Sequence, residues 1–242
     1  EIHVSTAEGM AKKLDLDESH YECGCHPPYD DASRKTARET GINSFHNNCS
    51  GKHSGMLALA QKLGANTKNY IDFDHPVQQA IWDQLKDITG KTSLSYGIDG
   101  CSTPTPFLSL TEIAILFQKL GSGKYPELER AYNAMASHSY LMAGRERFDT
   151  DFNSVLNGRG ITKVGGEAIR GMVIKTKEYG RVGIAQKILD GNQRANETAI
   201  TAILKHLDLL TEDEYAPLQK YEKKALYNHR KIHIGDVEAV IS

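Results

Sequence analysis

The sequence predicts an α+β fold, in which helices flank an antiparallel sheet and also form a separate helical lobe. Apolar residues recur at helical spacing in several segments before residue 143. After residue 160 the pattern changes to short apolar runs separated by glycine-containing turns, which is typical of neighbouring strands. We expect the 242 residues to form one domain, with the helical lobe at about 50–150 and the sheet-forming part at about 155–242.

The N-terminal segment predicts two helices separated by a loop. The first helix is expected over residues 5–14, with Ser5 or Thr6 as its N-cap. The run Cys-Gly-Cys-His-Pro-Pro at 23–28 contains two consecutive prolines, so it is expected to be a loop. A short, charged helix is expected over residues 30–40.

Further helices follow, each marked by its boundary residues. One is expected to begin near Ser50 and to end at Gly64, because glycine is a common C-terminal signal. Another covers 76–88, with Pro76 in its first turn. Glycine and proline punctuate residues 92–106, which are expected to form an irregular strand and loop. Two more helices are expected at 107–120 and 127–143.

The last third of the chain supplies the predicted sheet. Strands are expected at 161–164, 168–174 and 182–188. An amphipathic helix follows at 193–210. The charged stretch 212–224 is expected to be a solvated connection, and residues 226–241 supply one or two short strands.

Composition excludes several classes of partner. The formal net charge is −2, which gives no global attraction to nucleic acid or to an anionic membrane. No apolar run approaches the roughly 18 residues of a membrane helix, and the first residues do not resemble a signal peptide. The four cysteines are therefore expected to be reduced thiols in a cytoplasmic protein, serving metal binding or plain burial: Cys23, Cys25, Cys49 and Cys101.

The densest polar cluster is His-Asn-Asn-Cys-Ser-Gly-Lys-His at residues 46–53. Cys49 and Lys52 are three residues apart, so on a helix they point to one side. A thiolate is a strong zinc ligand, and lysine ligates only as the neutral amine. The alternative is a buried cysteine beside a surface lysine. A phosphate-binding loop is excluded, because position 46 is not glycine and His53 follows Lys52.

Two other sequence motifs contain candidate metal-binding, substrate-binding or catalytic residues. In Asp99-Gly-Cys-Ser-Thr-Pro104, Cys101 is a candidate soft ligand, and Asp99 either holds a substrate amine or orients a ligand. The alternative is a tight turn with a capping aspartate. Lys163 precedes a double glycine at a predicted strand end and is a candidate to activate a serine or bind a carboxylate. The alternative is that Lys163 is an exposed lysine before a turn, without a catalytic role. Cys23 and Cys25 are interpreted as structural thiols.

These motifs together resemble the rhizobial-type L-asparaginase family. The resemblance rests on Cys-Gly-Cys-His-Pro at 23–27, the cluster at 46–53, Gly-Ile-Asp-Gly-Cys-Ser-Thr-Pro at 97–104 and Lys-Val-Gly-Gly-Glu at 163–167. Ile-Leu-Asp-Gly at 188–191, followed by Arg-Ala, is also similar. The resemblance implies a fold like that of serine β-lactamases, penicillin-binding proteins and glutaminases.

The resemblance also implies a site and a reaction. Zinc (Zn2+) would be held by Cys49, Lys52 and Cys101, while His53 and Asp99 would line the substrate pocket. Lys163 would be the catalytic lysine that pairs with an active serine. The implied reaction is hydrolysis of L-asparagine to L-aspartate and ammonia, by a homodimer.

The chain departs from this family in one respect. The family has a Ser-x-x-Lys pair followed by a Ser-His-Ser-Gly-Glu stretch, and no serine here has lysine three residues later. We expect both catalytic serines to precede residue 1, so that these 242 residues alone are nearly inactive. Two alternatives remain: a β-lactamase-like or glutaminase-like amidohydrolase with another substrate, and a zinc-stabilised module without catalysis.

Overall fold

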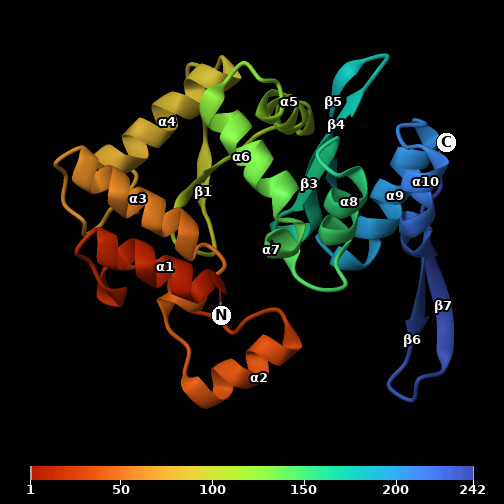
Figure 1. Ribbon diagram of the computed structural model, residues 1–242, viewed down its shortest axis with the longest axis horizontal. Coiled ribbons are helices and arrows are strands. Elements are labelled where there is room, and N and C mark those ends of the chain that lie inside the picture. Colours follow the sequence, from red (N-terminus) through yellow and green to blue (C-terminus); the bar gives the residue numbers. More distant parts are fainter. Residues whose placement is uncertain (1, 242) are drawn as a thin grey trace. The chain divides into compact units, whose positions relative to one another are not determined.

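A computed structural model describes residues 2–241, and the chain forms two compact units, Glu1–Leu108 and Ser109–Ser242. Each unit is described by itself, and Figure 1 labels the elements of both. Within the described residues, ten α-helices accompany three small antiparallel sheets, which confirms the predicted α+β class. The similarity to serine β-lactamases and the single domain stay predictions.

The first unit is mainly helical and carries one two-stranded sheet. Its core is a cluster of buried side chains that includes Leu57, Tyr70 and Val77, all with no exposed surface. The helices are α1 (Ile2–Lys13), α2 (Asp31–Thr40), α3 (Ser50–Lys62) and α4 (Pro76–Thr89), and the strands are β1 (Tyr96–Ile98) and β2 (Pro104–Pro106). Two 3-10 turns lie at Glu18–His20 and Ser44–His46.

The predicted boundaries of α2, α3 and α4 are confirmed to within one or two residues. Pro76 begins α4, and Gly64 follows α3 with a positive φ of 64°. The predicted cap of α1 is wrong. This helix already includes Ile2, so the Ser5 and Thr6 hydroxyls lie inside its first turns and donate to the Ile2 carbonyl.

The second unit is built on a three-stranded antiparallel sheet in the order β3–β4–β5. The strands are β3 (Gly160–Val164), β4 (Ile169–Thr176) and β5 (Gly180–Lys187), which confirms the three predicted strands. The helices of this unit are α5 (Leu110–Leu120), α6 (Pro126–Ser137), α7 (Ser139–Ala143), α8 (Phe148–Leu156), α9 (Asn196–His206) and α10 (Glu212–Tyr215).

Glycines let α5 approach the sheet closely. A β-carbon added at Gly171 would overlap the Phe117 ring, and one added at Gly183 would overlap the backbone carbonyl of Ala114. Ser109 caps this helix by a capping box with Glu112. The helix therefore begins at Leu110 and not at residue 107 as predicted.

Three segments of the second unit differ from the sequence prediction. The helix predicted at 127–143 is interrupted at His138, whose φ of −129° and ψ of 50° are not helical. Helix α8 was not predicted. The stretch 212–224 is not a solvated connection. It holds α10 and a 3-10 segment, Ala216–Tyr221, whose Leu218 is completely buried.

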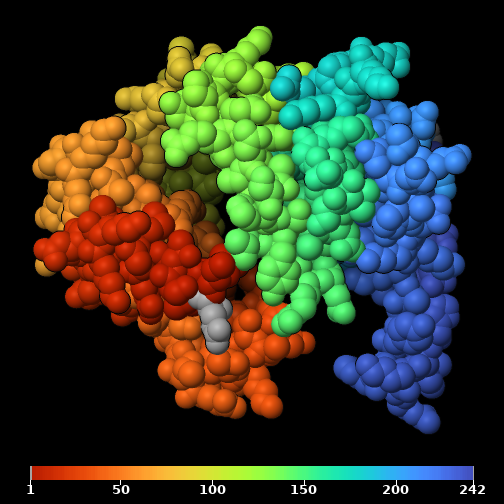
Figure 2. All heavy atoms as spheres, in the orientation of Figure 1, coloured from red at the N-terminus to blue at the C-terminus, as the bar shows by residue number. Residues whose placement is uncertain are grey.

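The C-terminal strands β6 (Lys223–Tyr227) and β7 (His233–Glu238) confirm the strands expected near the end of the chain. They pair only with each other among the described residues, as a separate hairpin that projects from its own unit (Figures 1 and 2). No helix within residues 2–241 has both the length and the apolar character needed to cross a bilayer.

Candidate metal centre

The N-terminus of α3 supplies the first half of the candidate site. Cys49 is the residue immediately before the helix, and Lys52 lies in the first turn. The Cys49 side chain makes no capping hydrogen bond to the helix. Its backbone N–H donates to Asn47 Oδ1 at 2.8 Å. The sequence cluster at 46–53 therefore does place Cys49 and Lys52 at one helix end.

The turn between β1 and β2 supplies the second half. Asp99 N donates to the Thr103 carbonyl at 2.8 Å, which closes the turn. Asp99 Oδ1 accepts from Gly100 N at 2.6 Å, and Ser102 has a positive φ of 73°. These bonds hold the Asp99 carboxylate and the Cys101 thiol on the same short loop. The tight turn that was the alternative for this motif is therefore present, and it leaves the Cys101 thiol beside the Asp99 carboxylate.

The two halves meet within the first unit. Cys49 Sγ, Cys101 Sγ and a carboxylate oxygen of Asp99 all lie within 4.8 Å of one another. Lys52 Nζ donates to Asp99 Oδ2 at 3.2 Å and to Thr103 Oγ1 at 3.1 Å. Folding therefore brings four predicted site residues together, although they come from two segments about 50 positions apart in the chain.

The local contacts shift the acidity of these groups. Burial raises the pKa of Cys49 to about 11, against the opposing charge of Lys52. Burial also disfavours ionised Cys101, but hydrogen bonds from Thr103 and Lys52 outweigh it and lower the pKa of Cys101. Burial disfavours charged Lys52, yet its hydrogen bond with Cys101 and the nearby negative groups raise the pKa of Lys52. Lys52 is thus an ammonium paired with Asp99.

His53 lies beside this cluster and is completely buried. Its Nδ1 is 2.6 Å from the Tyr70 hydroxyl, and its Nε2 has no hydrogen-bond partner among the described residues. Burial and the Lys52 charge lower the pKa of His53 to about 4, so the ring is neutral at pH 7. His53 is therefore packed inside the first unit at the base of the cluster.

Comparison with known proteins gives the family. A family model described as L-asparaginase II matches residues 1–239. The chain belongs to the L-asparaginase II family. A search of curated proteins found no match. The resemblance drawn from the sequence motifs is confirmed, and membership of this family supports an asparaginase-type amidohydrolase with a small-molecule substrate.

The donor atoms of this site fit a zinc ion. Two thiols select soft or borderline metals such as zinc, and a carboxylate or an amine completes a tetrahedral set with one open position. The structure groups Cys49, Asp99 and Cys101 as candidate ligands, with Lys52 in contact with Asp99. A cluster that could hold a metal ion is thus present.

Lys163 belongs to the second unit. It lies in β3, one residue from the strand end, and is partly buried. Its Nζ donates to the Val164 carbonyl at 2.7 Å. The strand-end position predicted from the sequence is confirmed, and its catalytic role stays a prediction.

Sequence reasoning did not identify three residues that contact the cluster or the adjacent His53. Thr103 binds Lys52 and Cys101, and a signal for it was present, since it lies two residues after Cys101 in the same motif. Asn47 also lies in a motif and binds the Cys49 backbone. Tyr70 is in an irregular segment without a motif, so only the fold shows that it contacts His53.

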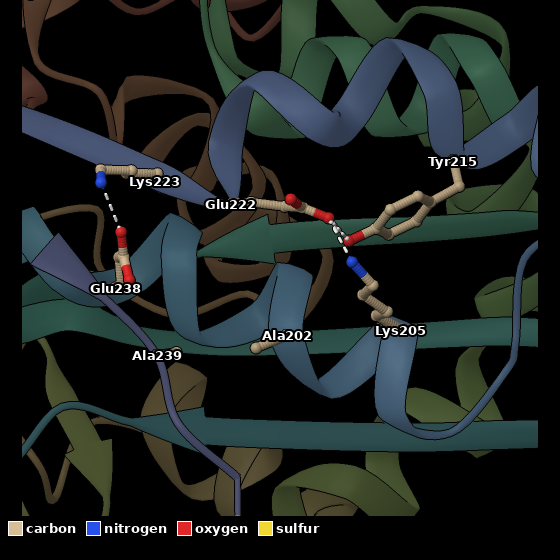
Figure 3. Close-up of a pocket in the computed structure, with 7 residues that line it drawn as sticks. All are labelled: Ala202, Lys205, Tyr215, Glu222, Lys223, Glu238 and Ala239. Carbon is tan, nitrogen blue, oxygen red and sulfur yellow. Dashed lines mark hydrogen bonds and ion pairs between the residues drawn. The ribbon is translucent and has the colours of Figure 1, made fainter.

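A pocket elsewhere in the second unit does not compete with this cluster. It has a volume of about 310 Å3 and lies between α9, α10 and the β6–β7 hairpin. Its polar groups bind one another, because Lys205 Nζ and the Tyr215 hydroxyl both contact Glu222, while Lys223 contacts Glu238 (Figure 3). The ion-paired side chains are also well exposed, so the pocket offers no desolvated site.

Proposed function

We propose that the chain carries the zinc centre and most of the substrate pocket of an L-asparaginase, which hydrolyses L-asparagine to L-aspartate and ammonia. The observation that carries this proposal is the meeting of Cys49, Cys101, Asp99 and Lys52, in a chain that belongs to the L-asparaginase II family. Cys49, Lys52 and Cys101 are proposed as the zinc ligands. Asp99 is proposed to face the substrate, and the buried His53 to line the pocket from the layer of side chains behind it.

The chemistry of the site suits an amino-acid amide. Zinc, when bound, supplies Lewis-acid polarisation and orientation of a substrate oxygen. The pKa of Asp99 is lowered, because the charge and hydrogen bond of Lys52 outweigh the effect of burial, so the carboxylate is ionised at neutral pH. An ionised carboxylate complements the α-ammonium group of asparagine.

Lys163 is proposed as the general base of a serine/lysine mechanism. As the neutral amine, Lys163 would take the proton of a serine hydroxyl as Oγ attacks the side-chain amide carbon, and would then give that proton to the amide nitrogen, which leaves as ammonia. Water would hydrolyse the resulting ester to aspartate and regenerate the serine. The family resemblance also implies a cytoplasmic homodimer, which measurement of the mass in solution would check.

The metal content of the chain tests the centre. We expect about one zinc per chain, and little zinc in Cys49→Ala with an unchanged circular dichroism spectrum. A folded parent without zinc would contradict the proposed metal centre.

Substrate choice is tested by calorimetry, which requires no turnover. The zinc-loaded chain is expected to bind L-asparagine more tightly than L-glutamine, and Asp99→Asn is expected to weaken asparagine binding. Equal affinity for both amides would favour a glutaminase-like enzyme. No binding of either would favour a zinc-stabilised module without this substrate.

A further inference from the structure

Asn47 uses both ends of its side-chain amide beside the candidate centre. Its Nδ2 donates to the Cys23 carbonyl at 2.8 Å and to the Gly24 carbonyl at 3.2 Å. Its Oδ1 accepts from the backbone N–H of Cys49 at 2.8 Å. The residue is 6% exposed. Two donors and one acceptor on a short side chain are the properties of asparagine, and no other residue supplies them uncharged at this length.

The bond to Cys49 fixes the backbone at the start of α3. Cys49 occupies the position before α3, where a side chain ordinarily caps the helix, but its thiol makes no such bond. Asn47 Oδ1 accepts the Cys49 N–H instead, and this bond fixes the backbone from which the thiol projects.

The other two bonds anchor Asn47 to a different part of the first unit. The Cys23–Gly24 backbone belongs to the loop between α1 and α2, and the Cys23 thiol is itself buried and contacts the Ser44 carbonyl. Cys49 is therefore tied, through one buried amide, to a segment of the core that carries none of the candidate ligands.

We propose that Asn47 is a positioning residue for the metal centre. It holds the backbone of Cys49 against the Cys23–Gly24 loop, so that the Cys49 thiol stays directed toward Cys101. The inference rests on the proposed metal centre and adds to it a residue that touches no metal.

The neighbouring Asn48 provides a matched control. It has the same side chain, lies on the same approach to α3 and is exposed. Its contacts are with His26, since Asn48 N lies 3.0 Å from His26 Nε2 and its side-chain oxygen 2.9 Å from the same atom. Loss of this side chain should leave the Cys49 N–H and its acceptor untouched.

The test is the zinc dissociation constant, measured by competition with a chromophoric chelator on the full 242-residue chain. Asn47→Ala is expected to weaken zinc binding roughly 10–100-fold, the range for residues that orient a metal ligand. Asn48→Ala is expected to match the parent. With cobalt in place of zinc, Asn47→Ala should also alter the thiolate-to-cobalt absorption, which a change in overall stability would leave unaltered.

The outcomes distinguish a failure of the proposed metal centre from a failure of the role of Asn47. A parent without zinc would overturn the metal centre itself. Parent-like affinity in folded Asn47→Ala, or equal losses in both alanine variants, would overturn the role of Asn47. If Asn47→Ala does not fold, the zinc affinity of the isosteric Asn47→Asp is compared with those of the parent and Asn48→Ala instead. This variant keeps the acceptor for Cys49 N–H but loses both donors.

Discussion

The role of Lys52 in the candidate centre depends on whether its amine is protonated. It is an ammonium that donates to Asp99 and Thr103, and an ammonium has no lone pair for a metal. If Lys52 is a ligand, zinc must displace its proton, and Asp99 loses its ion pair. If Lys52 keeps its proton, Asp99 is the carboxylate that completes the set with the two thiols.

Substitution at the two positions distinguishes these arrangements. We expect Lys52→Met to lower zinc affinity by more than about 100-fold, beyond the effect of losing a residue that only orients a ligand. Asp99→Asn should lower it less, because its oxygen still orients Lys52. The measurement is chelator competition on both variants. The reverse order of losses would assign Asp99, and not Lys52, as the third ligand.

The buried ion pair of Asp149 and Arg170 sets a second prediction. Both side chains are 2% exposed, and Arg170 also donates to Asn196 and Thr162. Removing one partner of a buried pair leaves the other charge uncompensated, so Asp149→Ala should lower the free energy of unfolding by about 3–5 kcal/mol. Urea denaturation measures this loss.

An exposed ion pair provides the reference for this loss of unfolding free energy. Asp190 and Arg194 are more than half exposed and 3.4 Å apart. Asp190→Ala should therefore change the free energy of unfolding by less than about 1 kcal/mol. Similar losses in Asp149→Ala and Asp190→Ala would show that the buried pair contributes no more than a solvated one.

Among the elements, helices with a strong apolar segment and recognisable ends were predicted, and α8 was not. Helix α4 has an apolar stripe, α3 has the apolar run at 56–60, and the boundaries of both were predicted closely. Helix α8 buries Asp149 and Asn153 beside its aromatic residues, which interrupts the apolar pattern. Those polar groups are satisfied by partners in β3 and β4, such as Thr162 and Arg170, and a sequence pattern does not show such pairing.

The contact of α5 with its sheet yields a prediction at the scale of elements. A β-carbon at Gly183 would overlap the Ala114 carbonyl, which is backbone and cannot rotate away. Gly183→Ala should therefore cost about 1–3 kcal/mol of unfolding free energy, the usual effect of overpacking. Gly166 has open space around its α-carbon, so Gly166→Ala is the matched control and should change stability by under about 0.5 kcal/mol. Equal stability of the two variants would contradict this packing.

At the scale of the whole molecule, the sequence predicted the α+β class and the candidate site residues that the fold brings together, but not the separation into units. Cys49, Lys52, Asp99 and Cys101 carried recognisable motifs, and all lie in the unit Glu1–Leu108. The division falls between Leu108 and Ser109, within the segment 107–120 that the sequence predicts as one helix. Separate cores in the two units, built from contacts distant in sequence, determine this boundary.

The location of the metal cluster predicts where zinc stabilises the chain. A ligand that binds only the folded state stabilises it by RT ln(1 + [L]/Kd), which is about 2.7 kcal/mol at a concentration of 100 Kd. All candidate ligands project from α3 and from the β1–β2 turn, whereas β4 lies in the other unit with its own core. Excess zinc should therefore slow amide hydrogen exchange in residues 50–62 and 96–106 and leave β4 unchanged, as measured by mass spectrometry. Cys49→Ala should abolish the slowing. Equal protection of β4 would mean that the two units unfold as one cooperative body, and zinc binding would then stabilise the entire chain.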